Sequence, residues 1–141
     1  MQKNLVHTTV IDVKFNEVDS LGIVWHGHYV RYFEDGREAF GKLHNIGYLD
    51  FYAHGYVVPI VHVDCDYKKV LRYGDRVIVE TSFVPCESAK IQFNYRLLHA
   101  QTNELVVTGS TVQVFLQMDS FALQLTNPEF FQAWKQLHGF T

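Results

Sequence analysis

Residues 18–40 read VDSLGIVWHGHYVRYFEDGREAF, a turn-like segment followed by the strongest helical pattern in the chain. Its apolar stripe has spacings of four and three residues and continues just past the quoted stretch: Tyr29, Phe33, Gly36, Phe40 and Leu43. Such spacing places side chains on one face of a helix. The pattern predicts a helix of about four turns that begins near residues 25–28 and turns one face to the core.

Gly36 lies on the apolar stripe of this helix. A glycine inside a helix costs about 1 kcal/mol relative to alanine. We therefore expect another backbone to approach the helix closely at Gly36. On the opposite face, oppositely charged residues at i,i+4 form the pairs Arg31–Asp35 and Glu38–Lys42.

The remaining sequence predicts strands and a short final helix. Alternating or continuously apolar segments predict strands at residues 5–15, 57–65, 76–84, 91–97 and 105–117, with a tight turn at Tyr73-Gly74-Asp75. Residues 44–55 are expected to form an irregular connection. A short final helix is predicted after Asn127 as its N-cap and Pro128 as its first residue. Its apolar stripe is Phe130, Trp134 and Leu137, and Gly139 is expected to end it.

One strand, one long helix and four further strands indicate an α+β fold. We expect a curved antiparallel sheet wrapped around the long helix, with the short C-terminal helix at its end, as a single domain over residues 1–141. One small sheet cannot cover a four-turn helix completely. Dimerisation is therefore expected from burial alone.

Composition narrows the classes of function. The net charge of −3 over 141 residues provides no basic surface for nucleic acid. The two cysteines, Cys65 and Cys86, lack metal-ligand spacing and are expected to be free thiols. His62, Asp64 and Asp66 are expected on a polar outer sheet face, so we predict no metal site. With no apparent signal peptide or membrane-length apolar run, we expect a cytoplasmic protein without a membrane partner.

The quoted stretch also suggests chemistry. Asp19 precedes the predicted helix, and residues 25–28 contain no side chain of the types that usually cap a helix N-terminus. Uncapped backbone N–H groups can hold a developing oxyanion, while a carboxylate acts as nucleophile or general base. In the alternative interpretation, Asp19 caps a turn and His26 and His28 are surface residues.

A family resemblance bears on this choice. Eleven residues match, in register, the signature of the 4-hydroxybenzoyl-CoA thioesterase branch of the hotdog-fold superfamily: Asp19, Gly22, Ile23, Val24, Trp25, His26, Tyr29, Tyr32, Phe33, Glu34 and Arg37. Residues 57–81 resemble the family's second strand, its Tyr…Gly-Asp turn and its third strand. The sequence departs from the pattern at Gly36, where the family usually has alanine.

The resemblance implies a hotdog fold, assembly into homodimers or homotetramers, and hydrolysis of acyl-CoA thioesters without a metal or bound cofactor. It assigns Asp19 as the catalytic carboxylate, with His26 as a second catalytic residue. Backbone N–H groups near Gly27 and His28 would bind the oxyanion, with Tyr29 beside the substrate. Two alternatives remain: a hotdog hydratase or dehydratase, and a non-catalytic acyl-CoA-binding module.

Overall fold

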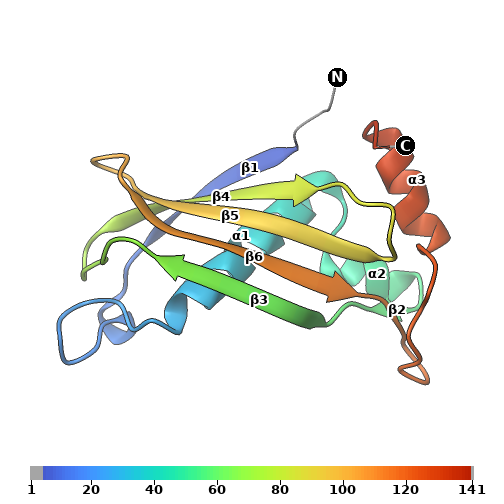
Figure 1. The fold of residues 1–141 in the computed structure, drawn as a ribbon, viewed down its shortest axis with the longest axis horizontal. Helices are drawn as coiled ribbons and strands as arrows, with labels where there is room; N and C mark the ends of the chain where they lie inside the picture. The colour runs from blue at the N-terminus through green and yellow to red at the C-terminus, as the bar shows by residue number, and fades with distance from the viewer. Residues whose placement is uncertain (1–4, 141) are drawn as a thin grey trace.

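The computed structural model describes residues 5–140, which form a five-stranded antiparallel sheet curved around one long helix (Figure 1). The sheet has the strand order β1-β4-β5-β6-β3, and all neighbours are antiparallel. Its strands are β1 (Val6–Asp12), β3 (Ile60–Tyr67), β4 (Arg76–Val84), β5 (Lys90–His99) and β6 (Leu105–Val114). The predicted α+β class and antiparallel sheet are confirmed.

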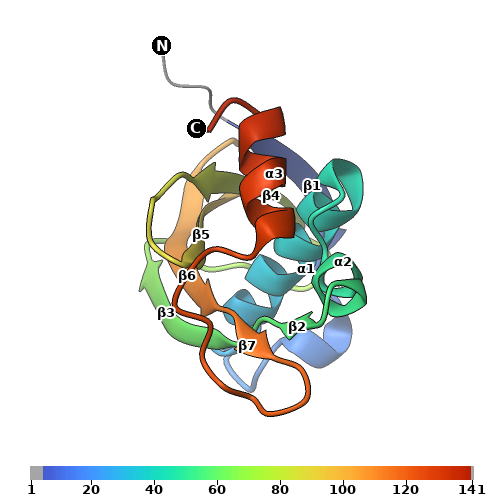
Figure 2. The same cartoon turned by 90° about the vertical axis from the view of Figure 1, so that its right-hand side faces the viewer.

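The long helix α1 (His28–His44) lies in the concave face of this sheet (Figure 2). It packs against β1 and β4, and a short turn η1 (Phe15–Glu17) precedes it in the chain. The other elements are α2 (Tyr48–Ala53), the two-stranded pair β2 (Tyr56–Val57) and β7 (Leu116–Gln117), and α3 (Glu129–Leu137) at one end of the sheet. None of the helices within residues 5–140 is long and apolar enough to cross a bilayer.

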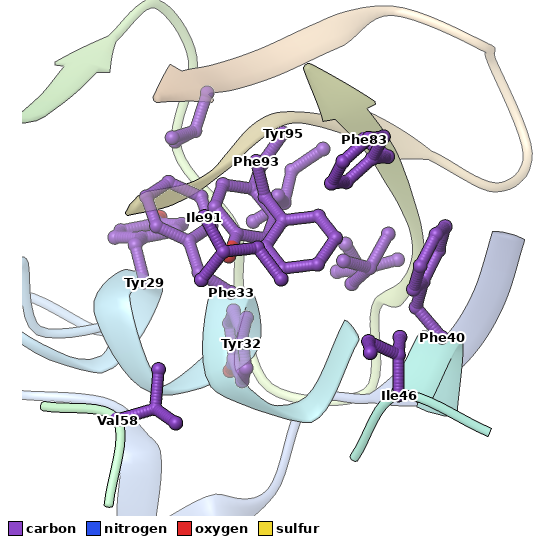
Figure 3. Packing of buried hydrophobic residues seen from close by; sticks show 14 of the residues in the cluster. Tyr29, Tyr32, Phe33, Phe40, Ile46, Val58, Phe83, Ile91, Phe93 and Tyr95 are labelled. Carbon is purple, nitrogen blue, oxygen red and sulfur yellow. The ribbon is translucent and has the colours of Figure 1, made fainter. Parts of the chain in front are cut away.

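The predicted apolar stripe of α1 is buried over most of its length. Tyr29, Phe33, Gly36 and Phe40 are buried, whereas Leu43 is 59% exposed, so the stripe ends one turn before the helix does. Figure 3 shows the aromatic packing that α1 makes with the sheet. The Phe33 ring stacks on Tyr95 with centroids 4.5 Å apart and planes at 7°.

The expected close approach at Gly36 is confirmed, although side chains and not a backbone make it. A Cβ at this position would lie 2.5 Å from Thr81 Oγ1 and 2.6 Å from Val79 Cγ1, both on β4. The two side chains are short and β-branched, so they have little freedom to move away. Glycine at position 36 therefore sets the distance between α1 and β4.

We predict that Gly36→Ala destabilises the protein, although alanine is the better helix former. Overpacking costs about 1–3 kcal/mol, and the gain in helix propensity is about 1 kcal/mol. Thr81→Ala removes one of the two obstructing atoms and leaves Val79 Cγ1 in place, so the double variant should recover part of the loss. Denaturant unfolding of both variants checks this. A Gly36→Ala variant more stable than the wild type would contradict it.

Two helical predictions were wrong in detail. Residues 48–53, expected to be irregular, form α2, whose N-terminus is fixed by a 2.7 Å hydrogen bond from the Gly47 N–H to Asp50 Oδ2. Pro128, not Asn127, is the N-cap of α3, because the Asn127 side chain donates to the Glu87 carbonyl. The predicted apolar stripe of α3 was also wrong at its end: Leu137, expected to be on the buried face, is 80% exposed, and Phe131 is buried instead at 1% exposure.

The strands also depart from prediction at their ends. The expected strand at residues 105–117 stops at Val114, and after Phe115 the chain continues as β7, which pairs with β2. The turn at Gly74 is confirmed, with φ +87°. The strand expected from residue 57 begins at Ile60 and forms an edge of the sheet as β3.

His44 joins the end of α1 to α3. The Trp134 indole N–H donates to the His44 carbonyl at 2.8 Å, and the His44 and His138 ring centroids are 5.7 Å apart. Burial lowers the pKa of His44, and electrostatic interactions with His138 and His7 lower it further. The His44 Nε2 atom is buried without a hydrogen-bond partner among residues 5–140. Protonation at this position is therefore unfavourable in the folded state.

We predict that the free energy of unfolding decreases as the pH falls through about 6.5, the ordinary pKa of histidine. Below that pH the unfolded chain binds a proton at His44 that the folded chain resists, so acid favours unfolding. Urea denaturation at pH 7.5 and 5.5 should show a smaller pH effect in His44→Gln than in the wild type. His62→Gln, at an exposed position, is the control. An unchanged pH effect in His44→Gln would contradict the prediction.

Candidate active site

Residues 17–25 form a small hairpin that carries Asp19. The Trp25 N–H donates to the Glu17 carbonyl at 2.9 Å, and the Asp19 N–H donates to the Ile23 carbonyl at 2.9 Å. The hairpin turns through Gly22, whose φ of +79° lies in the left-handed region that favours glycine. The Gly22 N–H closes the turn on the Asp19 carbonyl at 2.9 Å. Asp19 is thus held by backbone bonds just before α1.

The Asp19 carboxylate has one oxygen engaged and one available. Oδ1 accepts the Leu21 N–H at 2.8 Å, the turn contact that the alternative interpretation predicts. Within residues 5–140, Oδ2 has no hydrogen bond and no cation lies within ion-pair distance of the carboxylate. The side chain is half-buried. Turn formation and chemistry are therefore compatible at this residue, because they use different oxygens.

The predicted uncapped N-terminus of α1 is confirmed: Gly27 is the N-cap and no side chain bonds to the first turn. The His28 N–H is not available, however, because it donates to the Trp25 carbonyl at 2.9 Å. Within residues 5–140, the N–H groups of His26 and Gly27 have no acceptor. The N–H groups of His26 and Gly27 are therefore available as donors, whereas the N–H of His28, one of the two positions expected to supply them, is not.

The other predicted site residues surround this helix start. The His26 ring is exposed and packs 4.9 Å from Trp25, while its carbonyl accepts the Tyr67 hydroxyl at 2.8 Å. Tyr29 lies beneath the site at 3% exposure. Burial raises the pKa of Tyr29, and the negative charge of Asp19 contributes to the shift. A contact between Tyr29 and substrate remains a prediction.

Sequence reasoning missed two residues here. Tyr67, at the end of β3, supports the His26 carbonyl, and Glu17, only 2% exposed, lies at the base of the hairpin. For Glu17, the sequence offered one indication: the residue is an acid only two positions before Asp19. Tyr67 had none, because only the fold brings the end of β3 to the start of α1.

A cavity of about 720 Å³ lies along the second half of α1. Its apolar lining comes from the loop after α1, α2, the start of β3 and the inner sheet face: Ile46, Phe51, Val58, Ile60, Ile91 and Phe93. Arg37 also lines it and donates to the Tyr95 hydroxyl at 3.3 Å. The residues of α1 that line the cavity begin at Glu34, so it lies toward the opposite end of the helix from Asp19.

The polar residues of β3 form a local surface network. His62 Nε2 lies 3.2 Å from Asp64 Oδ2, and the Ser110 hydroxyl donates to the same oxygen. Asp64 therefore contacts both the histidine and the serine. Within the described residues, His62 makes no hydrogen bond to the Ser110 hydroxyl, so the three side chains do not form a serine–histidine nucleophile pair. No set of three metal-ligating side chains comes together within the described residues.

Comparison with known proteins identifies the family. The family model of the thioesterase-like superfamily matches residues 13–134. YneP of Bacillus subtilis, a proposed acyl-CoA thioesterase, is 30% identical over 111 residues, which cover 79% of this chain and 80% of YneP. A DHNA-CoA thioesterase structure from Staphylococcus aureus has a TM-score of 0.83 at 24% identity, covering 94% of this chain and 91% of its own.

A further likeness of fold is to the structure of a 4-hydroxybenzoyl-CoA thioesterase mutant complexed with 4-hydroxybenzoyl-CoA. The TM-score is 0.79 at 18% identity, and the alignment covers 92% of this chain and 97% of that one. The family model spans most of the sequence, YneP aligns over about four fifths of it, and the sheet curves around α1 (Figure 2). The chain therefore belongs to the thioesterase-like superfamily and has the hotdog fold.

Proposed function

We propose that this hydrolase cleaves acyl-CoA thioesters to free acid and CoA, with Asp19 as the catalytic carboxylate. The observation that carries the proposal is the pairing of two features. Asp19 Oδ2 has no hydrogen bond within the described residues, and the nearby start of α1 offers two N–H groups without acceptors, at His26 and Gly27. A carboxylate beside preorganised backbone donors suits acyl transfer, in which negative charge develops on one oxygen.

Two routes are compatible with this geometry. As a nucleophile, Asp19 forms an acyl anhydride and releases CoA thiolate, and water then hydrolyses the anhydride to acid and free Asp19. As a general base, Asp19 takes a proton from water, which attacks the carbonyl directly while the C–S bond breaks and the thiolate takes up a proton. In both routes, the His26 and Gly27 N–H groups donate to the oxyanion. The exposed His26 ring would bind the thioester or the leaving group.

We further propose that the working unit contains two copies of the chain. β3 is an edge strand, and its side chains are exposed on both faces: the adjacent residues Val63 and Asp64, which point to opposite faces, are 37% and 51% exposed, and Val61 is 57% exposed. An edge strand of this kind is open to pairing with another strand. Antiparallel pairing of two β3 strands would bring the cavity beside Ile60 in one copy toward the Tyr67 end of its partner. The acyl group would then lie between the Asp19 of one copy and the cavity of the other.

We predict that light scattering gives a dimer or a tetramer for the wild type. Val61→Lys places a charge on the exposed edge of β3 and should shift the protein to monomer with loss of turnover. The control is Val10→Lys on the opposite edge strand β1, where Val10 is 56% exposed. It should change neither mass nor activity. A monomeric wild type with full turnover would rule out the shared site.

The test of the function is CoA release from short, medium, long-chain and aromatic acyl-CoAs. Product should be detected chromatographically, because Cys65 and Cys86 are free cysteines and a thiol reagent would add their signal to that of CoA if it modified them. Turnover of at least one substrate is expected. Hydration of an enoyl-CoA without CoA release would favour the hydratase alternative. Tight binding without any reaction would favour the binding module.

A further inference from the structure

We propose that Glu17 is a positioning residue that locks the Asp19 hairpin onto α1, an inference that rests on the proposed function. Glu17 is 2% exposed, and its side chain is among the largest that are fully buried. A buried carboxylate is costly unless hydrogen bonds and charges satisfy it. An apolar residue would fill the same space at lower cost. The position of this acid therefore calls for a reason beyond stability.

Both oxygens of Glu17 are engaged, and their partners come from two separate segments. Oε1 accepts the Lys14 N–H at 2.7 Å and the Tyr32 hydroxyl at 3.0 Å, while Oε2 pairs with the Arg31 guanidinium. Tyr32 is fully buried, and burial raises its pKa to about 12, so its hydroxyl remains a donor at neutral pH. One carboxylate thus joins the chain before the hairpin to the first turns of α1.

The backbone of Glu17 extends this connection to the hairpin. Its carbonyl accepts the Trp25 N–H, which closes the base of the hairpin. Val18 is extended, with φ −92° and ψ +148°, and this single residue separates Glu17 from Asp19. The position in which Glu17 is held therefore sets the position of the hairpin base, and through the hairpin backbone that of Asp19.

Small displacements at a reacting group are costly, since a misplacement of about 1 Å can reduce the rate about 10²-fold. Two substitutions test the length and the charge of the Glu17 side chain separately. Glu17→Asp keeps the charge but withdraws the oxygens by one methylene. Glu17→Gln keeps the length and the Oε1 acceptor but turns an amide N–H₂ toward Arg31. We expect kcat to fall about 100-fold in Glu17→Asp and about 10-fold in Glu17→Gln, with KM within about twofold.

A second measurement reports geometry without activity. Hydrogen exchange of the Asp19 and Trp25 amides, which close the hairpin, should accelerate in both Glu17 variants while β5 and β6 amides keep wild-type protection. Tyr32→Phe removes one hydrogen bond to Glu17 and keeps the ring, so it should lower kcat about fivefold without changing KM. Glu80→Gln is the control, because Glu80 pairs with Arg96 between β4 and β5 and lines neither the hairpin nor the cavity.

The outcomes distinguish the two proposals. Wild-type kcat and wild-type amide exchange in Glu17→Asp, with Asp19→Asn inactive, would overturn the role of Glu17 and leave the proposed function intact. A fully active Asp19→Asn would overturn Asp19 as the catalytic carboxylate of the proposed function, and the role of Glu17 with it. If KM rises by the same factor by which kcat falls in the Glu17 variants, and if amides throughout the protein lose protection from hydrogen exchange, Glu17 has a structural role only, and the proposal is overturned.

Discussion

Asp19→Asn is expected to reduce turnover of acyl-CoA by about 10³-fold, because asparagine supplies neither a nucleophilic carboxylate nor a base. The fold should be unaffected. The contact from the Leu21 N–H to Oδ1 can be made equally well by the asparagine carbonyl, and the hairpin closes through backbone bonds. Substrate affinity should remain near the wild-type value, since the loss concerns the chemical step. Steady-state kinetics with a thermal melt of each protein measures both effects.

The matched control is Asp12→Asn. Asp12 is an exposed carboxylate that pairs with Arg76 at 3.0 Å across β1 and β4, and within residues 5–140 no hydrogen bond or ion pair joins its side chain to the hairpin or to α1. Surface pairs of this kind contribute little. We expect wild-type kinetics in this variant. An equal loss of turnover in both variants would indicate a general effect of charge and would remove the special role of Asp19.

Phe33→Ala is expected to lower the free energy of unfolding by about 3–5 kcal/mol. Phe33 is fully buried and stacks on Tyr95, and its ring also occupies the space beside Gly109, where a Cβ would lie 2.5 Å from the ring. Gly109 has no side chain with which to fill the space that Phe33 would leave. The cavity should therefore persist, and its cost adds to the lost transfer free energy. Urea unfolding followed by circular dichroism gives the value.

Leu43→Ala tests the same helix at an exposed position. Leu43 belongs to the sequence stripe but is 59% exposed, so its truncation should change the free energy of unfolding by less than about 0.5 kcal/mol. A loss at Leu43 comparable with that at Phe33 would show that a partner covers this end of α1. A small loss at Phe33 would contradict the packing described here.

Much of the fold was predictable because its main signals are local. The stripe through Phe33 and Phe40 specifies α1, and alternation specifies β4 and β5 in nearly their observed positions. Where tertiary packing decides, prediction was less accurate. Phe131 and not Leu137 is buried in α3, because the helix docks on Phe83 and Phe115 with a face that its short sequence leaves ambiguous. The short helix α2 has too few residues for a periodic pattern.

The candidate site shows the same division. Asp19 and the missing cap on α1 were visible in the sequence, because both are local features. The engagement of the His28 N–H by Trp25 was not, since it depends on how the chain bends into the helix. The burial of Glu17 depends on Tyr32 and Arg31, which lie a hairpin away in sequence. Sequence periodicity carries no information about contacts between residues this far apart in the chain, so these partners could not be predicted.

The most direct measurement is a single-turnover experiment in ¹⁸O-labelled water, with enzyme in excess over the best acyl-CoA of the panel. Mass spectrometry after rapid quenching follows the thioester and the acid. We predict that the wild type converts bound thioester to acid, with ¹⁸O entering the acid in the general-base route and the acid or Asp19 in the nucleophile route, while Asp19→Asn binds the same thioester and leaves it intact. Labelled acid formed by Asp19→Asn at the wild-type rate would contradict the assignment of Asp19 as the catalytic carboxylate.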